Sequence, residues 1–190
     1  MKNTVRLTTA VLMLILALGS FPVSSPAALS TPSLPELMNG LKSPEDVEKF
    51  LRRHFNFRED QQLFGTFDYW QTPEEFWQKR AGDCEDFAIF SQYALQKLGI
   101  DAHVVSIYGR GGYAHTVTLF VDGDGYSVMN EDRLYRFRSR NLEDVLTRLY
   151  PEWTWAAVAE QRGTRGFLLR EIRNPRLQQF TRAPFPVPGF

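Results

Sequence analysis

The spacing of apolar residues in this chain changes once, close to Gly99. Before Gly99, apolar residues recur every three or four positions, as in helices that bury one face. After it, they alternate in short runs separated by glycine and aspartate, as in strands. Helices followed by a meander of strands form an α+β fold. The pattern therefore predicts N-terminal helices packed on an antiparallel sheet.

Three helix boundaries can be located in the first half of the chain. Residues 43–46 place a serine before Pro-Glu-Asp, the residue types of an N-cap, a first position and a first turn. Residues 72–75 repeat this with threonine and add Glu75, which predicts a capping box. A third helix is predicted from about Cys84 to Leu98, where Gly99 ends it.

The second half of the chain reads as strands with one short helix. Asp122-Gly123-Asp124-Gly125 predicts a hairpin turn between two of the strands. Asn141 predicts the cap of a helix that runs to Tyr150. The strands are predicted at 101–108, 113–121, 126–129 and 134–137, with weaker patterns at 153–159 and 166–172.

The first 27 residues have the pattern of a secretory signal. A short basic start is followed by an apolar run over residues 10–18 and then by small residues and prolines. The run is shorter than the roughly 20 residues that span a membrane. We therefore expect a periplasmic or secreted protein with no stable membrane span once the signal is removed; an uncleaved anchor is the alternative.

The rest of the chain divides into a linker at 28–43, one domain at 44–175 and an irregular tail at 176–190. Lysines and arginines number 22 and acids also number 22, so the formal net charge is zero. A neutral chain gives no reason to expect a nucleic acid as partner.

The chain has one cysteine, Cys84, at the predicted start of the third helix. Exported proteins usually pair their cysteines in disulfides, so a single thiol is either inert or reactive. Unpaired N–H groups at a helix start favour a thiolate. The alternative is a small buried side chain without chemistry.

Two polar residues complete a pattern typical of a thiol nucleophile. His115 lies in a predicted strand, and Asn130 ends the strand after the hairpin. Because the hairpin pairs these strands antiparallel, the end of one approaches the start of the other. We therefore expect Asn130 to orient His115, and His115 to exchange a proton with Cys84.

These residues also carry a resemblance to a known family. The motifs Gly82-Asp83-Cys84-Glu85-Asp86, Ala114-His115 and Val128-Met129-Asn130 resemble the transglutaminase-like cysteine peptidases, in particular the bacterial periplasmic branch. The similarity covers roughly residues 45–137. It implies a papain-like, transglutaminase-like fold with the catalytic residues Cys84, His115 and Asn130. The family usually has aspartate at the third position, and Asp132 is the alternative to Asn130.

The acids beside the thiol raise the question of a metal. Like charges oppose thiolate formation, and a bound Ca²⁺ would neutralise them. The resemblance implies Asp83 and Glu85 as calcium ligands; no other cofactor is expected. The structural alternative is that these acids simply favour a helix start.

The residues and the resemblance together predict an exported enzyme. It would be a cysteine peptidase that cleaves a protein or peptide of the cell envelope. Transamidation and deamidation use the same acyl-enzyme and remain open. The competing hypothesis is a catalytically silent module that binds a peptide or protein.

Overall fold

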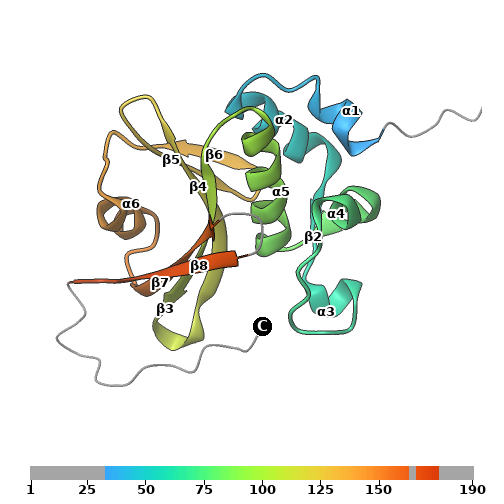
Figure 1. Ribbon diagram of the computed structural model, residues 1–190. Helices are drawn as coiled ribbons and strands as arrows, with labels where there is room; N and C mark the ends of the chain where they lie inside the picture. Colours follow the sequence, from blue (N-terminus) through green and yellow to red (C-terminus); the bar gives the residue numbers. More distant parts are fainter. Residues whose placement is uncertain (1–32, 163–165, 176–190) are drawn as a thin grey trace, which may run out of the picture. The chain divides into compact units, whose positions relative to one another are not determined.

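A computed structural model describes residues 33–162 and 166–175 of the chain (Figure 1). The predicted signal at 1–27 and the predicted tail at 176–190 lie outside the described residues. Among the described helices, none is both long and apolar enough to cross a bilayer.

The helices that the sequence predicted begin where expected, whereas the helices at Leu34–Met38 and Asp60–Leu63 were not predicted. The Ser43 side chain accepts a hydrogen bond from the Asp46 amide, and Thr72 and Glu75 form a capping box. The third predicted helix begins at Cys84 itself. The helices are α1 (Leu34–Met38), α2 (Pro44–His54), α3 (Asp60–Leu63), α4 (Pro73–Lys79), α5 (Cys84–Lys97) and α6 (Leu142–Leu149), with a 3₁₀ turn at Arg110–Gly112.

The strands form one six-stranded antiparallel sheet in the order β6-β5-β4-β3-β7-β8. A separate parallel pair, β1 with β2, is two residues long on each side, too short for its period to be recognised in the sequence. The bounds are β1 (Asn56–Phe57), β2 (Ala81–Gly82), β3 (Ala102–Gly109), β4 (Ala114–Asp122), β5 (Gly125–Asn130), β6 (Arg133–Arg136), β7 (Trp153–Arg162) and β8 (Gly166–Arg173). The predicted α+β class is confirmed.

The hairpin between β4 and β5 sets the register that matters for the site. Asp122 pairs with Gly125, and the pairing continues to Thr118 opposite Met129. Gly123 has a φ of 64°, which suits glycine in this tight turn. The register brings the start of β4 and the end of β5 to the same end of the sheet.

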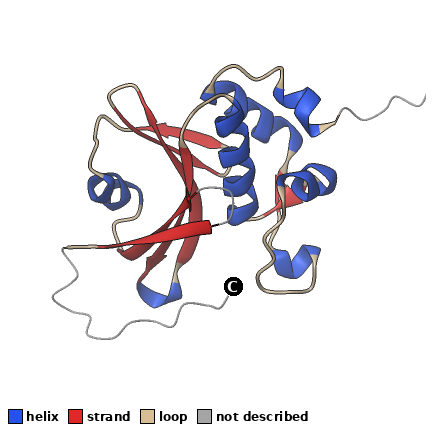
Figure 2. Cartoon of the chain, viewed as in Figure 1, coloured by secondary structure: helices blue, strands red, loops and turns tan. Residues whose placement is uncertain are grey.

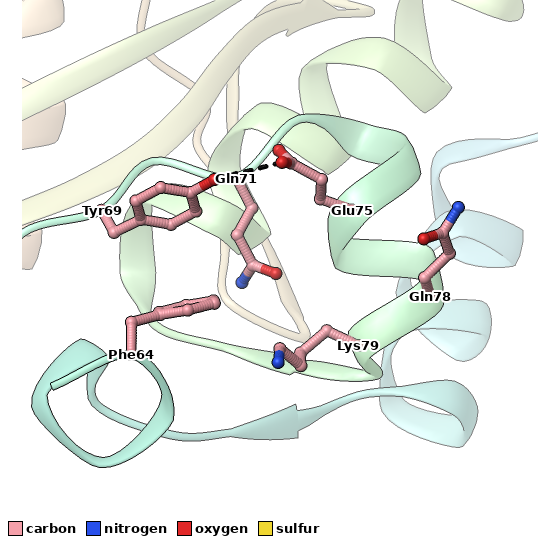
Figure 3. A pocket seen from close by; sticks show the side chains of 6 residues that line it. All are labelled: Phe64, Tyr69, Gln71, Glu75, Gln78 and Lys79. Carbon is pink, nitrogen blue, oxygen red and sulfur yellow. Dashed lines mark hydrogen bonds between the residues drawn. The ribbon is translucent and has the colours of Figure 1, made fainter.

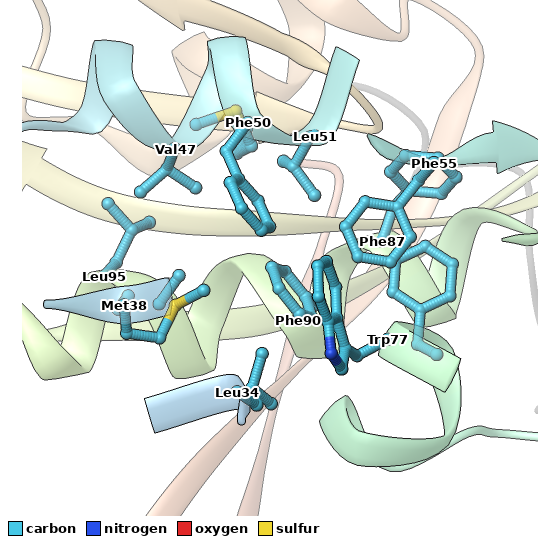
Figure 4. Close-up of a cluster of buried hydrophobic side chains, with 14 of the residues drawn as sticks. Leu34, Met38, Val47, Phe50, Leu51, Phe55, Trp77, Phe87, Phe90 and Leu95 are labelled. Atoms are coloured by element: carbon cyan, nitrogen blue, oxygen red, sulfur yellow. The ribbon is translucent and has the colours of Figure 1, made fainter. Parts of the chain in front are cut away.

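Helices cover both faces of the sheet (Figure 2). On one face, α5 packs against β4 and β3 and carries α2 and α4 on its outer side. This core is rich in aromatic rings, with Phe50 stacked on Phe90 at 5.9 Å (Figure 4). On the other face, α6 supplies Leu142, Val145 and Leu146 to a second core around Trp153.

The predicted linker at residues 28–43 is partly helical. It contains α1, whose Leu34 and Met38 are buried in the aromatic core. Two apolar residues one turn apart are too few to reveal a helical period. This part of the stretch is therefore part of the folded domain.

Candidate active site

The nucleophile candidate Cys84 is the first residue of α5 and is half-buried. The helix is fixed to β4 by the Thr118 hydroxyl, which donates to the Ala88 carbonyl over 2.7 Å. The backbone of Thr116 interacts with the Cys84 sulfur. The sulfur therefore lies beside β4 at the residue that follows His115.

His115 and Asn130 are joined by a hydrogen bond. His115 is near the start of β4, Asn130 ends β5, and the ring nitrogen Nε2 lies 2.7 Å from Oδ1. An amide oxygen only accepts, so Nε2 carries the proton. The lone pair of a neutral imidazole is then on Nδ1, which is available to take a proton.

The thiol itself has a different partner. It donates to the Glu85 carboxylate, with Sγ 3.1 Å from Oε2. Within the described residues, no hydrogen bond joins Cys84 to His115. Burial raises the pKa of the Cys84 thiol far above its usual value, the negative Glu85 raises it further, and the Thr116 backbone opposes the change. This geometry holds the thiol in its protonated form.

A cluster of buried acids surrounds the start of α5. Burial raises the pKa of Asp83 to about 8 and that of Asp86 to about 6, and it also raises those of Asp60 and Glu85. Their oxygens approach closely in the sets Asp60–Asp83–Asp86 and Asp60–Asp68–Glu85, each within 4.8 Å. A third set, Asp83–Cys84–Glu85, includes the thiol.

Two of these acids have an oxygen without a partner. Oδ1 of Asp60 and Oδ1 of Asp83 are buried and accept no hydrogen bond from the described residues. Unpaired, closely grouped carboxylate oxygens fit a hard cation such as Ca²⁺. Of the three sets, only the one that includes the Cys84 sulfur contains both Asp83 and Glu85. Sequence reasoning did not identify Asp60 and Asp68, because Asp60 begins α3 and Asp68 follows that helix, so they join the acids around Cys84 only in the fold.

The Asp86 carboxylate fastens the loop before α4 to the start of α5. It accepts from the Gln71 amide at 2.8 Å, from Gln71 Nε2 at 2.6 Å and from the Asp83 amide at 3.2 Å. Gly82 allows this approach, since a Cβ there would lie 2.1 Å from Asp86 Oδ2. Gln71 and Gly82 therefore hold Cys84 in place without touching it.

A surface pocket lies next to this framework, over α3 and α4. It has a volume of about 340 Å³ and is lined by Phe64, Tyr69, Gln71, Glu75, Gln78 and Lys79 (Figure 3). At its rim the Tyr69 hydroxyl donates to Glu75 over 3.1 Å. Neither Cys84 nor His115 lines it, so it is distinct from the cysteine–histidine site.

Comparisons with known proteins found similar solved structures and one matching family model. Two solved structures similar to this chain are of LapG from Legionella pneumophila. The calcium-bound form is 22% identical over 70% of this chain and 74% of LapG, with a TM-score of 0.48. The EGTA-treated form is 21% identical over 76% and 81%, with a TM-score of 0.47. A search of curated protein sequences found no match.

One family model matches the chain, and it is described as the transglutaminase-like superfamily. The match covers residues 34–136, which is more than half of the chain and includes Cys84, His115 and Asn130. It begins at α1 and ends with β6, so it contains the three elements that carry the candidate site, α5, β4 and β5. The chain therefore belongs to the transglutaminase-like superfamily, as the motif around its single cysteine predicted.

Proposed function

We propose that this protein is an exported cysteine peptidase that uses Cys84, His115 and Asn130 on a protein or peptide of the cell envelope. The observation that carries the proposal is the hydrogen bond from His115 to Asn130 at the strand beside the Cys84 sulfur. It orients a histidine on the strand whose next residue, Thr116, interacts with a thiol at a helix start. Membership of the superfamily supports the same chemistry.

The first half of the reaction forms an acyl-enzyme. His115 takes the thiol proton at Nδ1, and the Cys84 sulfur attacks the amide carbonyl carbon. Backbone N–H groups at the start of α5 stabilise the resulting oxyanion, at about 3 kcal/mol for each donor. His115 then gives its proton to the amide nitrogen, the carbon–nitrogen bond breaks, and the amine leaves. Asn130 keeps the ring oriented throughout.

The second half releases the acyl group. His115 removes a proton from water, the hydroxide oxygen bonds to the thioester carbon, and the carbon–sulfur bond breaks to give a carboxylic acid and the thiol. An amine in place of water would give transamidation, and a glutamine side chain as substrate would give deamidation. Hydrolysis is favoured because an exported enzyme meets much more water than free amine.

The acid cluster extends the proposal to calcium. Asp83 and Glu85, together with Asp60, would hold the ion, and the buried unpartnered oxygens of Asp60 and Asp83 support this assignment. Bound Ca²⁺ would neutralise the carboxylates beside the thiol. Isothermal calorimetry of the metal-stripped protein tests it: saturable heat is expected for wild type and not for Asp60→Asn. Absence of heat from wild type at millimolar Ca²⁺ contradicts the assignment.

A catalytically silent binding module is the second candidate. The hydrogen bond from Cys84 to Glu85 favours it, because a thiol held by a carboxylate is not activated. The two hypotheses predict different reactivities for the Cys84 thiol. A nucleophile paired with His115 reacts with iodoacetamide at neutral pH faster than free cysteine does, and His115→Ala loses that advantage. The His103→Ala variant is the matched control and keeps it.

The substrate is tested by proteomics of the cell envelope. Envelope proteins are exposed to the native protein, with and without Ca²⁺, and to Cys84→Ala. We expect new protein termini only with the native protein. New crosslinks instead of new termini would show transamidation, and identical proteomes would favour the binding module.

A further inference from the structure

Two tyrosine rings surround His115. The Tyr150 ring lies 5.5 Å from the imidazole, the Tyr113 ring lies 6.2 Å from it, and the two tyrosines are 6.1 Å apart. Sequence reasoning did not identify Tyr150, because it lies far from His115 along the chain, at the end of α6. The imidazole therefore has two aromatic neighbours besides its hydrogen-bond partner Asn130.

The backbone holds Tyr150 firmly. Its amide donates to the Leu146 carbonyl over 2.7 Å, and its carbonyl accepts from the Trp153 amide over 2.9 Å. It is therefore pinned between the end of α6 and the start of β7. The Tyr113 backbone also makes two hydrogen bonds, with Gly109 and Arg110, but its side chain follows a glycine-rich turn and is 46% exposed. Tyr150 is the better fixed of the two rings.

The contribution of Tyr150 comes from its ring. Its hydroxyl is buried and has no hydrogen-bond partner among the described residues. A buried hydroxyl without a partner costs free energy, so it does not explain the packing of this side chain. What the side chain gives to the site is an aromatic ring close to the imidazole, tilted by 57° to it.

The Tyr150 ring matters because Asn130, the hydrogen-bond partner of His115, carries no charge. A carboxylate beside a catalytic histidine stabilises the imidazolium by its charge, whereas an amide only orients the ring. Aromatic faces attract a cation within about 6 Å of their centre. We propose that Tyr150 is a positioning residue that holds His115 against Asn130 and stabilises the imidazolium that forms during proton transfer. The inference rests on the proposed role of His115.

The positioning is tested without catalysis, in the Cys84→Ala protein. The chain has only three histidines, so imidazole spectra by nuclear magnetic resonance can be assigned by substitution. In Tyr150→Leu, we expect the His115 Nε2 proton to exchange with water about tenfold faster. Tyr150→Phe keeps the ring and the protection. Tyr126→Leu, in the same core, is the matched control and leaves the exchange unchanged. Equal protection in folded Tyr150→Leu and Tyr150→Phe overturns the proposal.

The effect on charge is tested by thiol reactivity at one neutral pH. Tyr150→Leu should slow iodoacetamide alkylation of Cys84 about tenfold, and Tyr150→Phe should restore the rate. Adding Asn130→Asp to Tyr150→Leu should also restore it, because the carboxylate supplies the missing charge. A double variant as slow as Tyr150→Leu contradicts the charge role. A wild-type thiol that is unreactive even with Ca²⁺ present instead contradicts the proposed function, and the exchange experiment still tests the positioning.

Discussion

The immediate neighbours of Cys84 act on the thiol in opposite directions. The start of α5 and the Thr116 backbone favour a thiolate, whereas burial and Glu85 favour the protonated thiol. Burial is the largest of these effects, so the protonated form prevails in the metal-free protein. Burial therefore limits the reactivity of the Cys84 thiol most, and Glu85 limits it further.

Gly82 shows how tightly the residues around Cys84 are packed. Gly82→Ala would place a Cβ against the Asp86 carboxylate and Gln71 Nε2. We expect it to lower the free energy of unfolding by about 1–3 kcal/mol, measured by urea denaturation. The control is Gly123→Asn, at an open turn position with a positive φ that asparagine tolerates. A Gly82→Ala protein as stable as wild type would contradict the close approach.

His54 gives the fold a dependence on pH. It packs on Phe50 at 4.6 Å, and its pKa is lowered by burial and then by the positive Arg80 and Arg53. As pH falls below about 6.5, the unfolded chain binds the proton before the folded one does, so stability decreases. The contribution is fully present above that pH.

We therefore expect the urea midpoint to fall between about pH 7 and pH 5, and to fall less in His54→Phe, which keeps a ring against Phe50. His103→Phe is the comparison, since the His103 ring lies beside the exposed acid Asp101. The same decrease in His54→Phe as in wild type would show that other groups cause it.

Among the elements, α5 connects the two halves of the fold. One of its sides packs on β3 and β4, and the other packs on α2 and α4. Its first turn carries Cys84 and the acids, so the site is formed where helices and sheet meet. Stability of the aromatic core and position of the candidate nucleophile therefore depend on the same helix.

The short helix α1 is expected to contribute to that core. Met38→Ala removes a buried side chain, and we expect a loss of about 2 kcal/mol in the free energy of unfolding. Asn39→Ala, at the next and exposed position, is the matched control. The measurement is urea denaturation followed by tryptophan fluorescence. If the two variants are equally stable, α1 does not contribute to the core and belongs to a linker.

At the scale of the whole molecule, the acids come from segments far apart in the chain. Asp60 and Asp68 belong to the α3 region, while Asp83 and Glu85 flank the cysteine. Grouping buried carboxylates costs free energy in the metal-free protein, because burial disfavours their charged forms. A cation at the cluster would offset this cost.

Calcium is therefore expected to stabilise the folded protein. At a Ca²⁺ concentration about 100-fold above Kd, binding adds about 2.7 kcal/mol to the free energy of unfolding and raises Tm. Asp60→Asn should abolish the rise, and Asp101→Asn, a 90% exposed acid outside the cluster, should retain it. Differential scanning calorimetry with EGTA and with Ca²⁺ measures both. A Tm unaffected by Ca²⁺ contradicts the cluster as a metal site.

The sequence alone determined the features that depend on neighbouring residues. The caps at Ser43 and Thr72 and the turn at Gly123 depend on nearby side chains and backbone angles, so their residues predict them. The approach of Asn130 to His115 also follows from local order, because one hairpin pairs their strands.

Only the tertiary structure decided which distant residues meet. The contact of Tyr150 with His115, the addition of Asp60 to the acids of α5 and the hydrogen bonds from Gln71 to Asp86 all join separate segments. No sequence period or fixed spacing marks the residues that make these contacts. They depend on how α5 and α6 pack on opposite faces of the sheet. That packing is decided by the burial of all the apolar side chains in the two cores.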